Sequence, residues 1–455
     1  MIQRIKLFAA ALFLLAAAWI APPVIQRLRH LCPVKPTGVP EAQATAAWAR
    51  KYGVSCNVCH VAGYKLTRTG QQFLRSGHQM PGGEDKEANL SDYLALTAKL
   101  RSWQKNKNTE TLATGAETKE IRNSFEAHAL SIYAGGPLDK GFSFFSEMYL
   151  NENEKKNPLE NAEKTESDMG DWARSKLAEL YLQYNTGFGE DVSWTARMGR
   201  IMPWLIHLHG GGARLEYSRP LPFTSTVNSE NPYRTFSRQF GASTGLSYKD
   251  AFLELGVVNG TGKYENTVEI GTDTHKDVFA TLDYAFDGNG SMAGVYYYRG
   301  RYPSHWFVPS KYTGDDAFNQ LGLMGNYTID LQGVKGALVG SYLTGKNKFN
   351  TPGITGFEQK SKGYYIEAQS HLMAGDLAPY FRWDFFDADT SFKDNEKEGP
   401  VLGIHWKPME HGRFVLEGSQ YKSKNASKSL TTGAVTAATK QTTERETTLE
   451  IQFMF

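Results

Sequence analysis

The last seven residues, LEIQFMF (449–455), decide the fold, because polar and apolar side chains alternate through them. Every second residue from Leu449 to Phe455 is apolar and falls on one face of an extended strand. Glu450 and Gln452 fall on the other face. The same alternation recurs at 178–184, 364–372 and 377–385. The polar faces of two of these segments carry Glu179, Gln183, Arg382 and Asp384. Alternation alone also fits a soluble β-sandwich.

The spacing of the connections favours a barrel over a sandwich. Short connections are expected at 135–139, 187–190, 248–250, 287–290, 331–333, 373–376 and 408–411. Longer and more polar ones are expected at 107–120, 153–172, 203–235, 260–274, 301–315, 346–360, 388–397 and 424–446. Long and short connections alternate throughout. Eight long loops and seven short turns join sixteen strands, and both ends of the sheet then lie on the short-turn side.

Short periplasmic turns, long extracellular loops and strands of about 10 residues are typical of outer-membrane barrels. Lipid offers no hydrogen bonds to the backbone, so only helices and closed barrels cross it. The terminal Phe455 resembles the C-terminal aromatic residue by which bacterial barrels are recognised for assembly. We therefore expect an all-β, 16-stranded antiparallel transmembrane β-barrel in the outer membrane, with both ends of the barrel periplasmic. Such a barrel is wide enough for an aqueous lumen.

Composition agrees with many strands and turns. The 455 residues include 23 Tyr, 25 Phe and 44 Gly, and only three Cys. A net charge of +2 gives no indication of a nucleic-acid partner.

The N-terminus has the pattern of an export signal. Arg4 and Lys6 precede an apolar run from Leu7 to Ile20, which at roughly 14 residues is shorter than the about 20 that a spanning helix needs. Small residues at 16–18 and 44–46 both fit a cleavage site, and an uncleaved anchor is the alternative. We divide the chain into a signal segment (1–45), a second segment (46–90) and the barrel (91–455).

The second segment contains the pattern of a c-type haem attachment site, Cys56-x-x-Cys59-His60. The two thiols would bond the two porphyrin vinyl groups, and His60 would ligate the iron. A zinc knuckle would need a fourth ligand, for which only Cys32 or a distant His is available. A redox-active disulfide of Cys56 with Cys59 is the other alternative, although no βαβ pattern surrounds the pair.

The residues after the motif predict a helix that covers the porphyrin. Four residues at helical spacing form its apolar face: Leu66, Gly70, Phe73 and Leu74. Gly77 is a suitable helix terminator. His78 and Met80 follow, and either is able to complete the iron coordination. We expect Met80, which would raise the reduction potential relative to a second histidine.

These features resemble a known family, the fused outer-membrane cytochrome–porins that oxidise iron in iron-oxidising bacteria. The resemblance lies in residues 49–60 (ARKYGVSCNVCH), in Leu66, Gly70 and Phe73, and in Gly77-x-x-Met80. Residues 125–147 also read like that family's second and third strands. The chain departs from the family's pattern at four positions: Tyr64, Thr67, Thr69 and His78. The resemblance implies one covalent haem c, thioether links at Cys56 and Cys59, and His60 as the proximal ligand.

We therefore expect electron transfer across the outer membrane. Extracellular Fe(II) would reduce the haem, and a periplasmic carrier such as a soluble cytochrome c would accept the electron. A segment of this length is too short for a core of its own, so we expect it at the periplasmic end of the lumen. The alternatives are outward electron delivery to minerals and a diffusion porin whose haem segment is a plug. His207 and His209 are a further candidate iron-binding pair if the chain there is extended.

Overall fold

The computed structural model describes residues 47–62, 65–80, 89–152, 176–189, 191–212, 214–226, 231, 233–260, 275–303, 315–331, 334–349, 358–409, 411–429 and 432–454. The signal segment, Cys32, Tyr64 and Phe455 lie outside these residues, so the expectations for them stay predictions. The same holds for the proposed domain limits at 45 and 90.

Sixteen antiparallel strands form a closed barrel in the described part of the chain, as the sequence predicts. They are β3 (Leu94–Thr111), β4 (Ala116–Pro137), β5 (Phe142–Glu152), β6 (Lys176–Gly187), β7 (Val192–Ile201), β8 (Gln239–Tyr248), β9 (Ala251–Val258), β10 (Asp277–Ala285), β11 (Met292–Pro303), β12 (Asp315–Leu331), β13 (Val334–Lys348), β14 (Glu358–His371), β15 (Leu377–Asp387), β16 (Glu396–Met409), β17 (Gly412–Lys424) and β20 (Lys440–Met454). The first strand of the barrel pairs with the last, for example Ala98 with Phe453, and this pairing leaves no free edge.

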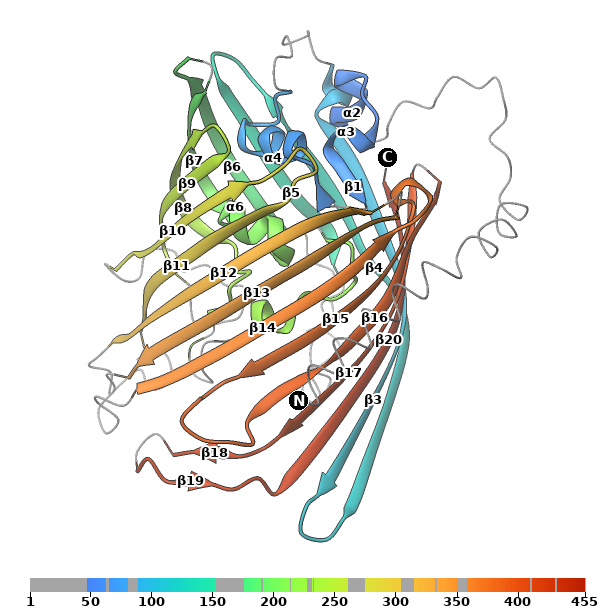
Figure 1. Cartoon of the computed structure of the whole chain (residues 1–455), viewed down its shortest axis with the longest axis vertical. Coiled ribbons are helices and arrows are strands. Elements are labelled where there is room, and N and C mark those ends of the chain that lie inside the picture. The colour runs from blue at the N-terminus through green and yellow to red at the C-terminus, as the bar shows by residue number, and fades with distance from the viewer. Residues whose placement is uncertain are drawn as a thin grey trace.

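Each strand pairs with its neighbours in sequence, so the connections alternate between the two ends of the barrel. The short turns lie at the upper end in Figure 1, where β3 begins and β20 ends. Both ends of the barrel are therefore on the short-turn side, as expected.

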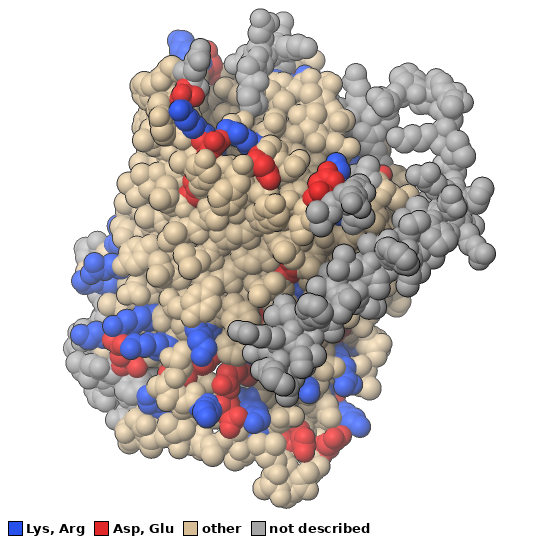
Figure 2. Space-filling model, viewed as in Figure 1, with Lys and Arg blue, Asp and Glu red and all other residues tan. Residues whose placement is uncertain are grey.

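The polar side chains of the strands point mostly into the barrel, where aromatic rings join them, and most of the exposed strand side chains are apolar. On β6, Glu179 is 3% exposed, whereas Leu180 and Leu182, which lie on the opposite face of the strand, are 44% and 49% exposed. The predicted inward residues Gln183, Arg382 and Asp384 are also buried. On the face that Figure 2 shows, the middle of the barrel carries few charged side chains, which gather towards its two ends. An apolar band between charged ends is the surface that a barrel presents to lipid.

Two of the expected loops differ from the structure. The loop expected at 107–120 is a tight connection, because β3 continues to Thr111 and β4 begins at Ala116. Cross-strand pairs such as Thr109 with Thr118 continue there although the apolar alternation has ended. The loop expected at 424–446 is shorter, because β20 begins at Lys440, and it contains a small hairpin of β18 (Ser427–Lys428) and β19 (Val435–Thr436). In both places the strand outlasts the apolar band, so hydrophobic periodicity underestimates its length.

The connection between β7 and β8 folds back into the lumen. It contains α6 (Trp204–Ile206), η3 (His207–Gly211) and α7 (Leu221–Thr224), which Figure 1 shows in green inside the barrel. Trp204, Leu205 and Ile206 are at most 2% exposed. They pack in an apolar cluster with inward-facing rings of the wall such as Tyr181 and Phe252. The interior of this barrel is therefore partly filled with protein.

The chain before the barrel is a compact helical segment at the short-turn end. It comprises α2 (Ala47–Tyr52), α3 (Cys56–Cys59), β1 (His60–Ala62), β2 (Lys65–Leu66), α4 (Arg68–Arg75) and η1 (Leu90–Asp92). Figure 1 shows α2, α3 and α4 in blue at that end. Among the described helices none has the length and hydropathy needed to cross a membrane. A small helical segment before the barrel was expected from the sequence. A further short helix, η5 (Met373–Gly375), forms one of the turns beneath it.

Candidate functional site

The Cys-x-x-Cys turn and the helix that follows it are fastened together by local contacts. Thr67 caps α4 by accepting a hydrogen bond from the backbone N–H of Gly70 at 3.1 Å. Its own hydroxyl donates to the carbonyl of Val58 at 2.7 Å. A β-carbon at Gly70 would collide with the carbonyl oxygen of Cys59. Only glycine therefore allows α4 to pack this closely against α3.

The segment is docked on the short turns of the barrel by hydrogen bonds to several of them. Trp48 Nε1 donates to the carbonyl of Gly135 at 2.7 Å. Gln71 Nε2 donates to the carbonyl of Gly290 at 3.0 Å, and the N–H of Arg68 donates to Gly288 at 3.2 Å. Because these turns are distributed around the barrel, the contacts hold the segment across its opening.

An ion pair also joins the segment to the barrel wall. Arg75 Nη2 lies 2.8 Å from Asp283 Oδ2 of β10, and their side chains are 11% and 0% exposed. The guanidinium also lies 4.2 Å from the ring centroid of Phe252. Gln183 Nε2 of β6 donates to the carbonyl oxygen of Arg75 at 2.7 Å. The end of α4 is thus held from two sides of the lumen.

A cavity of about 320 Å³ lies between this segment and the lumen. Its lining includes all five residues that the sequence singled out: Cys56, Cys59, His60, His78 and Met80. It also includes the four residues of the expected apolar face: Leu66, Gly70, Phe73 and Leu74. The structure therefore brings the candidate residues together around one space, which is of the size of a small-molecule site.

His78 is enclosed by aromatic rings. It follows Gly77, and both residues have positive φ, of 71° and 64°. Its ring stacks on Trp48 at a centroid distance of 4.3 Å and on Phe145 at 5.3 Å. The side chain is 1% exposed, and neither ring nitrogen has a hydrogen-bond partner in the structure. Burial lowers the pKa of His78 to about 3, so its imidazole is neutral near pH 7 and both nitrogens lack the partners that buried polar atoms normally have.

The two cysteines are free thiols in the structure, not a disulfide. Burial, with a smaller effect of Cys56, raises the pKa of the Cys59 thiol. Redox-active Cys-x-x-Cys pairs instead have a cysteine whose pKa is lowered. Among the described residues, no three or more Cys, His, Asp or Glu side chains are grouped so as to hold a metal ion.

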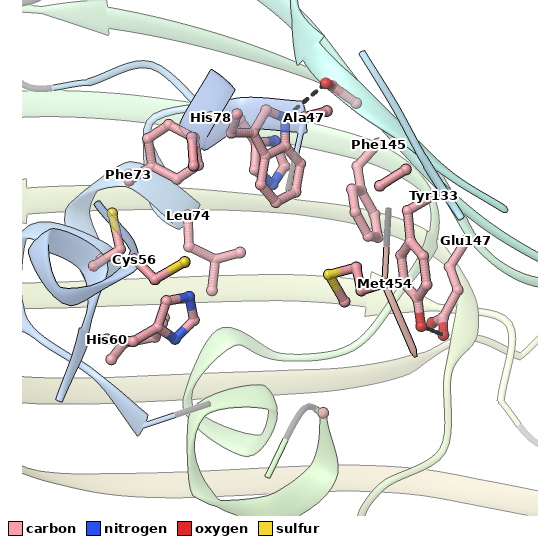
Figure 3. Close-up of a pocket in the computed structure, with 18 of the residues that line it drawn as sticks. Ala47, Cys56, His60, Phe73, Leu74, His78, Tyr133, Phe145, Glu147 and Met454 are labelled. Carbon is pink, nitrogen blue, oxygen red and sulfur yellow. Dashed lines mark hydrogen bonds between the residues drawn. The ribbon is translucent and has the colours of Figure 1, made fainter. Parts of the chain in front are cut away.

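The far side of the cavity is formed by the connection between β7 and β8, called the lumenal segment below, and by inward side chains of the barrel wall. Charged residues dominate this side: Lys99, Arg101, Glu147, Glu179, Arg214, Arg219, Arg238, Arg413 and Glu450. Figure 3 shows Cys56 and His60 on the left of the cavity, with Glu147 and Met454 on the right. The cavity therefore has a thiol and imidazole side and a charged side.

His207 and His209 are not on an extended strand, so the geometric basis of the expected iron-binding pair is wrong. Both belong to the helical turn η3. Only His207 lines the cavity. His209 is 1% exposed and its Nδ1 lies 3.0 Å from the carbonyl oxygen of Leu205. The backbone of His209 departs from helical geometry (φ −110°, ψ 31°), and its side chain does not reach the cavity that His207 lines.

Sequence reasoning missed the aromatic rings around His78 and the charged side of the cavity. Trp48 and Phe145 are ordinary aromatic residues of a helix and a strand, and no local pattern assigns them to one site. Arg214 and Arg219 lie in a connection that looked like an external loop. The apolar run from Ile201 to Leu208 was the available signal that this connection is buried.

The fold places the protein among porin-like barrels of the bacterial outer-membrane type. The chain is similar to the anion-selective porin from Comamonas acidovorans, with a TM-score of 0.51 and 13% sequence identity over 80% of this chain and 99% of that one. OmpT of Vibrio cholerae has a TM-score of 0.48 and 11% identity over 82% of this chain and all of its own (100%). The channel DcaP of Acinetobacter baumannii has a TM-score of 0.48 and 8% identity over 80% of this chain and 97% of its own. No protein-family description and no curated protein sequence matches the chain. The similarity therefore concerns the fold alone.

Proposed function

We propose that this protein is an outer-membrane electron-transfer porin that carries one covalent c-type haem in the cavity between its N-terminal segment and its barrel. The observation that carries the proposal is the convergence of Cys56, Cys59, His60 and His78 on one cavity. The apolar band around the barrel and its porin-like fold support an outer-membrane location. The resemblance to cytochrome–porins supports extracellular Fe(II) as the electron donor.

The residues around the cavity fit a haem. The thiols of Cys56 and Cys59 are free to form the two thioether links, and His60 lines the same space. Leu66, Phe73 and Leu74 supply the apolar contacts that exclude water from a porphyrin face. When bound, the haem supplies reversible one-electron exchange at its iron.

The second axial ligand that we propose is His78 rather than Met80. Both line the cavity, but only His78 is a buried polar group whose two nitrogens have no partner. Iron coordination at one nitrogen would give it a partner. Figure 3 shows His60 and His78 on opposite sides of the cavity with Cys56 between them. The stacked rings of Trp48 and Phe145 would fix the plane of the imidazole.

Two histidine ligands give a lower potential than a histidine and a methionine. Such a potential suits Fe(II) as donor near neutral pH, where its oxidised product precipitates. A periplasmic carrier such as a soluble cytochrome c would accept the electron at the short-turn end. Because the apolar band of such barrels is about 25 Å tall, a redox centre held within the barrel shortens the electron's path.

The deciding experiment is Fe(II) addition to cells or proteoliposomes that contain the full chain, followed at the reduced-haem absorption band. We expect haem absorbance in the purified protein, a covalent haem mass on the chain, and Fe(II)-dependent reduction. The Cys56→Ala, Cys59→Ala double variant should lack covalent haem. Wild-type protein without haem absorbance contradicts the haem site. Haem that Fe(II) does not reduce contradicts only the donor and the direction, and reduction by a periplasmic carrier would then support outward electron delivery.

The docking of the segment favours a second candidate function, a diffusion porin whose N-terminal segment is a plug. The segment lies across the short-turn end and is held there by the Arg75–Asp283 pair and the turn contacts. A plug predicts that deleting residues 47–80 raises single-channel conductance in planar bilayers. If haem-containing protein conducts ions as freely as the deletion variant, the plug is excluded.

A further inference from the structure

The charged side of the cavity has more cationic side chains than carboxylates. Six described cationic residues line it: Lys99, Arg101, Arg214, Arg219, Arg238 and Arg413. Three described carboxylates line it: Glu147, Glu179 and Glu450. An excess of buried positive charge is costly unless an anion compensates for it.

One arginine, Arg238, forms ion pairs with two of these carboxylates. Arg238 Nη2 lies 2.8 Å from Glu147 Oε2, and Arg238 Nε lies 2.6 Å from Glu179 Oε1. Tyr133 donates a further hydrogen bond to Glu147 at 2.7 Å. Both carboxylates therefore have a direct cationic partner, and Glu147 also attracts Lys99 at longer range.

The third carboxylate is shared by two other arginines. Arg101 Nη2 lies 2.6 Å from Glu450 Oε2, and Arg413 Nη2 lies 3.2 Å from Glu450 Oε1. Together with Arg238, this pairing uses every described carboxylate that lines the cavity.

Three cations have no carboxylate in direct contact, and the carboxylates Glu216, Glu450 and Glu417 attract Arg214 only at longer range. Lys99, Arg214 and Arg219 form no ion pair with any residue of the described chain. Arg219 Nε donates to the carbonyl of Gly211 at 3.1 Å, and Arg214 donates to the carbonyl of Tyr217. The Nε of Arg214 is buried and has no hydrogen-bond partner. Burial, together with the positive charges of Arg214 and Arg238, lowers the pKa of Arg219 to about 9. These groups lie where an anion would be stabilised.

The haem proposed above brings such an anion to this side of the cavity. Thioether links at Cys56 and Cys59 hold the vinyl edge of the porphyrin against α3. The two propionate groups occupy the opposite edge of the macrocycle, so they point away from α3. Guanidinium groups match carboxylates in shape and charge.

We infer that Lys99, Arg214 and Arg219 are positioning residues that bind the two propionate carboxylates of the covalent haem. This inference rests on the proposed haem site. The three cations compensate the propionate charges and fix the tilt of the porphyrin between the segment and the barrel. They also stabilise the reduced haem, which has one positive charge fewer than the oxidised haem.

The test compares holoprotein variants by two haem readouts. The Arg214→Gln, Arg219→Gln double variant should shift the propionate bending bands in resonance Raman spectra. It should also raise the ratio of oxidised to reduced haem at a fixed electrode potential about tenfold, which is about 59 mV for one electron. The Arg214→Lys, Arg219→Lys double variant keeps both positive charges, so its haem should have a reduction potential close to that of the wild type. Arg445→Gln is the matched control, because Arg445 is exposed on β20 and does not line the cavity.

Three outcomes overturn the inference. Propionate bands that are identical in wild type and in the Gln double variant would mean that these residues do not touch the propionates. An equal change of the reduction potential in Arg445→Gln would mean that the effect comes from the net charge of the protein and not from contact with the propionates. A saturable response of the wild-type potential to inorganic phosphate, at constant ionic strength, would assign the cluster to a dissolved anion. In all three cases the haem is present, so they differ from failure of the proposed function, which is the absence of haem from wild type.

Discussion

The Arg75–Asp283 ion pair is the contact whose removal should most weaken the docking of the N-terminal segment. The variant is Arg75→Gln, which removes the charge and retains hydrogen-bonding ability. It leaves Asp283, 0% exposed, without its cation, and it removes the guanidinium from the ring of Phe252. A buried carboxylate without its partner is destabilised by lost solvation as well as by the lost attraction.

The expected size of the effect follows from this burial. Breaking a buried pair by removing one partner costs about 3–5 kcal/mol, which is roughly a hundredfold to a few thousandfold in the ratio of docked to undocked segment. An exposed pair at the same end of the barrel is the matched control. Lys249 Nζ lies 3.9 Å from Asp191 Oδ2, with side chains 56% and 59% exposed. Lys249→Gln should cost at most about 1 kcal/mol, or about fivefold.

The assay is hydrogen exchange by mass spectrometry of the full chain in lipid nanodiscs. The amide of Arg68 donates to Gly288, and that of residue 71 donates to Thr67 within α4, so peptides covering 65–80 report on the segment. Their protection should fall by the factor given above in Arg75→Gln, whereas peptides from β12 and β13 should not change. Replacing both partners, Arg75→Met with Asp283→Leu, should restore most of the protection, because no unpaired charge remains.

Equal protection in Arg75→Gln and Lys249→Gln would refute this reasoning. It would mean that the turn contacts alone hold the segment. Loss of protection throughout the barrel would also refute it, because that result would mean that the ion pair stabilises the barrel itself and not the docking of the segment.

Two further predictions concern the cavity, and a third concerns His209 in the connection between β7 and β8. Gly70→Ala should lower the yield of covalent haem by at least about tenfold, because the added methyl group collides with the Cys59 carbonyl and separates α3 from α4. A haem stain of the purified protein measures this yield, and an unchanged yield would contradict the prediction. His78→Leu should convert the haem to a high-spin spectrum while Met80→Leu leaves it unchanged, and the reverse result would assign the ligand to Met80. Burial lowers the pKa of His209 from 6.5 to about 4, so the unfolded chain binds a proton that the folded chain does not as the pH falls below 6.5. His209 alone should therefore contribute a loss of stability of about 3 kcal/mol between pH 6.5 and pH 4, to which the buried His78 adds, and His209→Gln should make the urea midpoint in detergent less dependent on pH in that range.

Most of the barrel was predictable because its strands obey a strict physical rule. A strand between lipid and lumen must alternate, so Leu180 and Leu182 face outward while Glu179 and Gln183 face inward. The rule stops at the limit of the lipid. The β3–β4 hairpin continues past that limit with cross-strand pairs such as Thr109 with Thr118, and there the expected loop at 107–120 was wrong.

The site was predictable only where its residues are close in sequence. Cys56, Cys59 and His60 form a local pattern that is typical of c-type haem attachment, and the apolar face of α4 follows from helical spacing. The rings around His78 come from α2 and β5, and their meeting depends on how the segment docks. Periodicity within one strand carries no information about which side chain of another element will face it.

The haem site that we propose would account for the joining of the segment and the barrel in one chain. The segment provides thiols, His60 and one apolar face, but it is too short to enclose a porphyrin. The barrel provides Phe145 and Tyr181 on one side and the cations of the lumenal segment on the other. Each half is therefore an incomplete site, and haem binding should stabilise the docked arrangement because only that arrangement contacts both ends of the porphyrin. It follows that protein lacking haem should show the weak docking of Arg75→Gln even when Arg75 is intact, and hydrogen exchange of the Cys56→Ala, Cys59→Ala variant over residues 65–80 measures this directly.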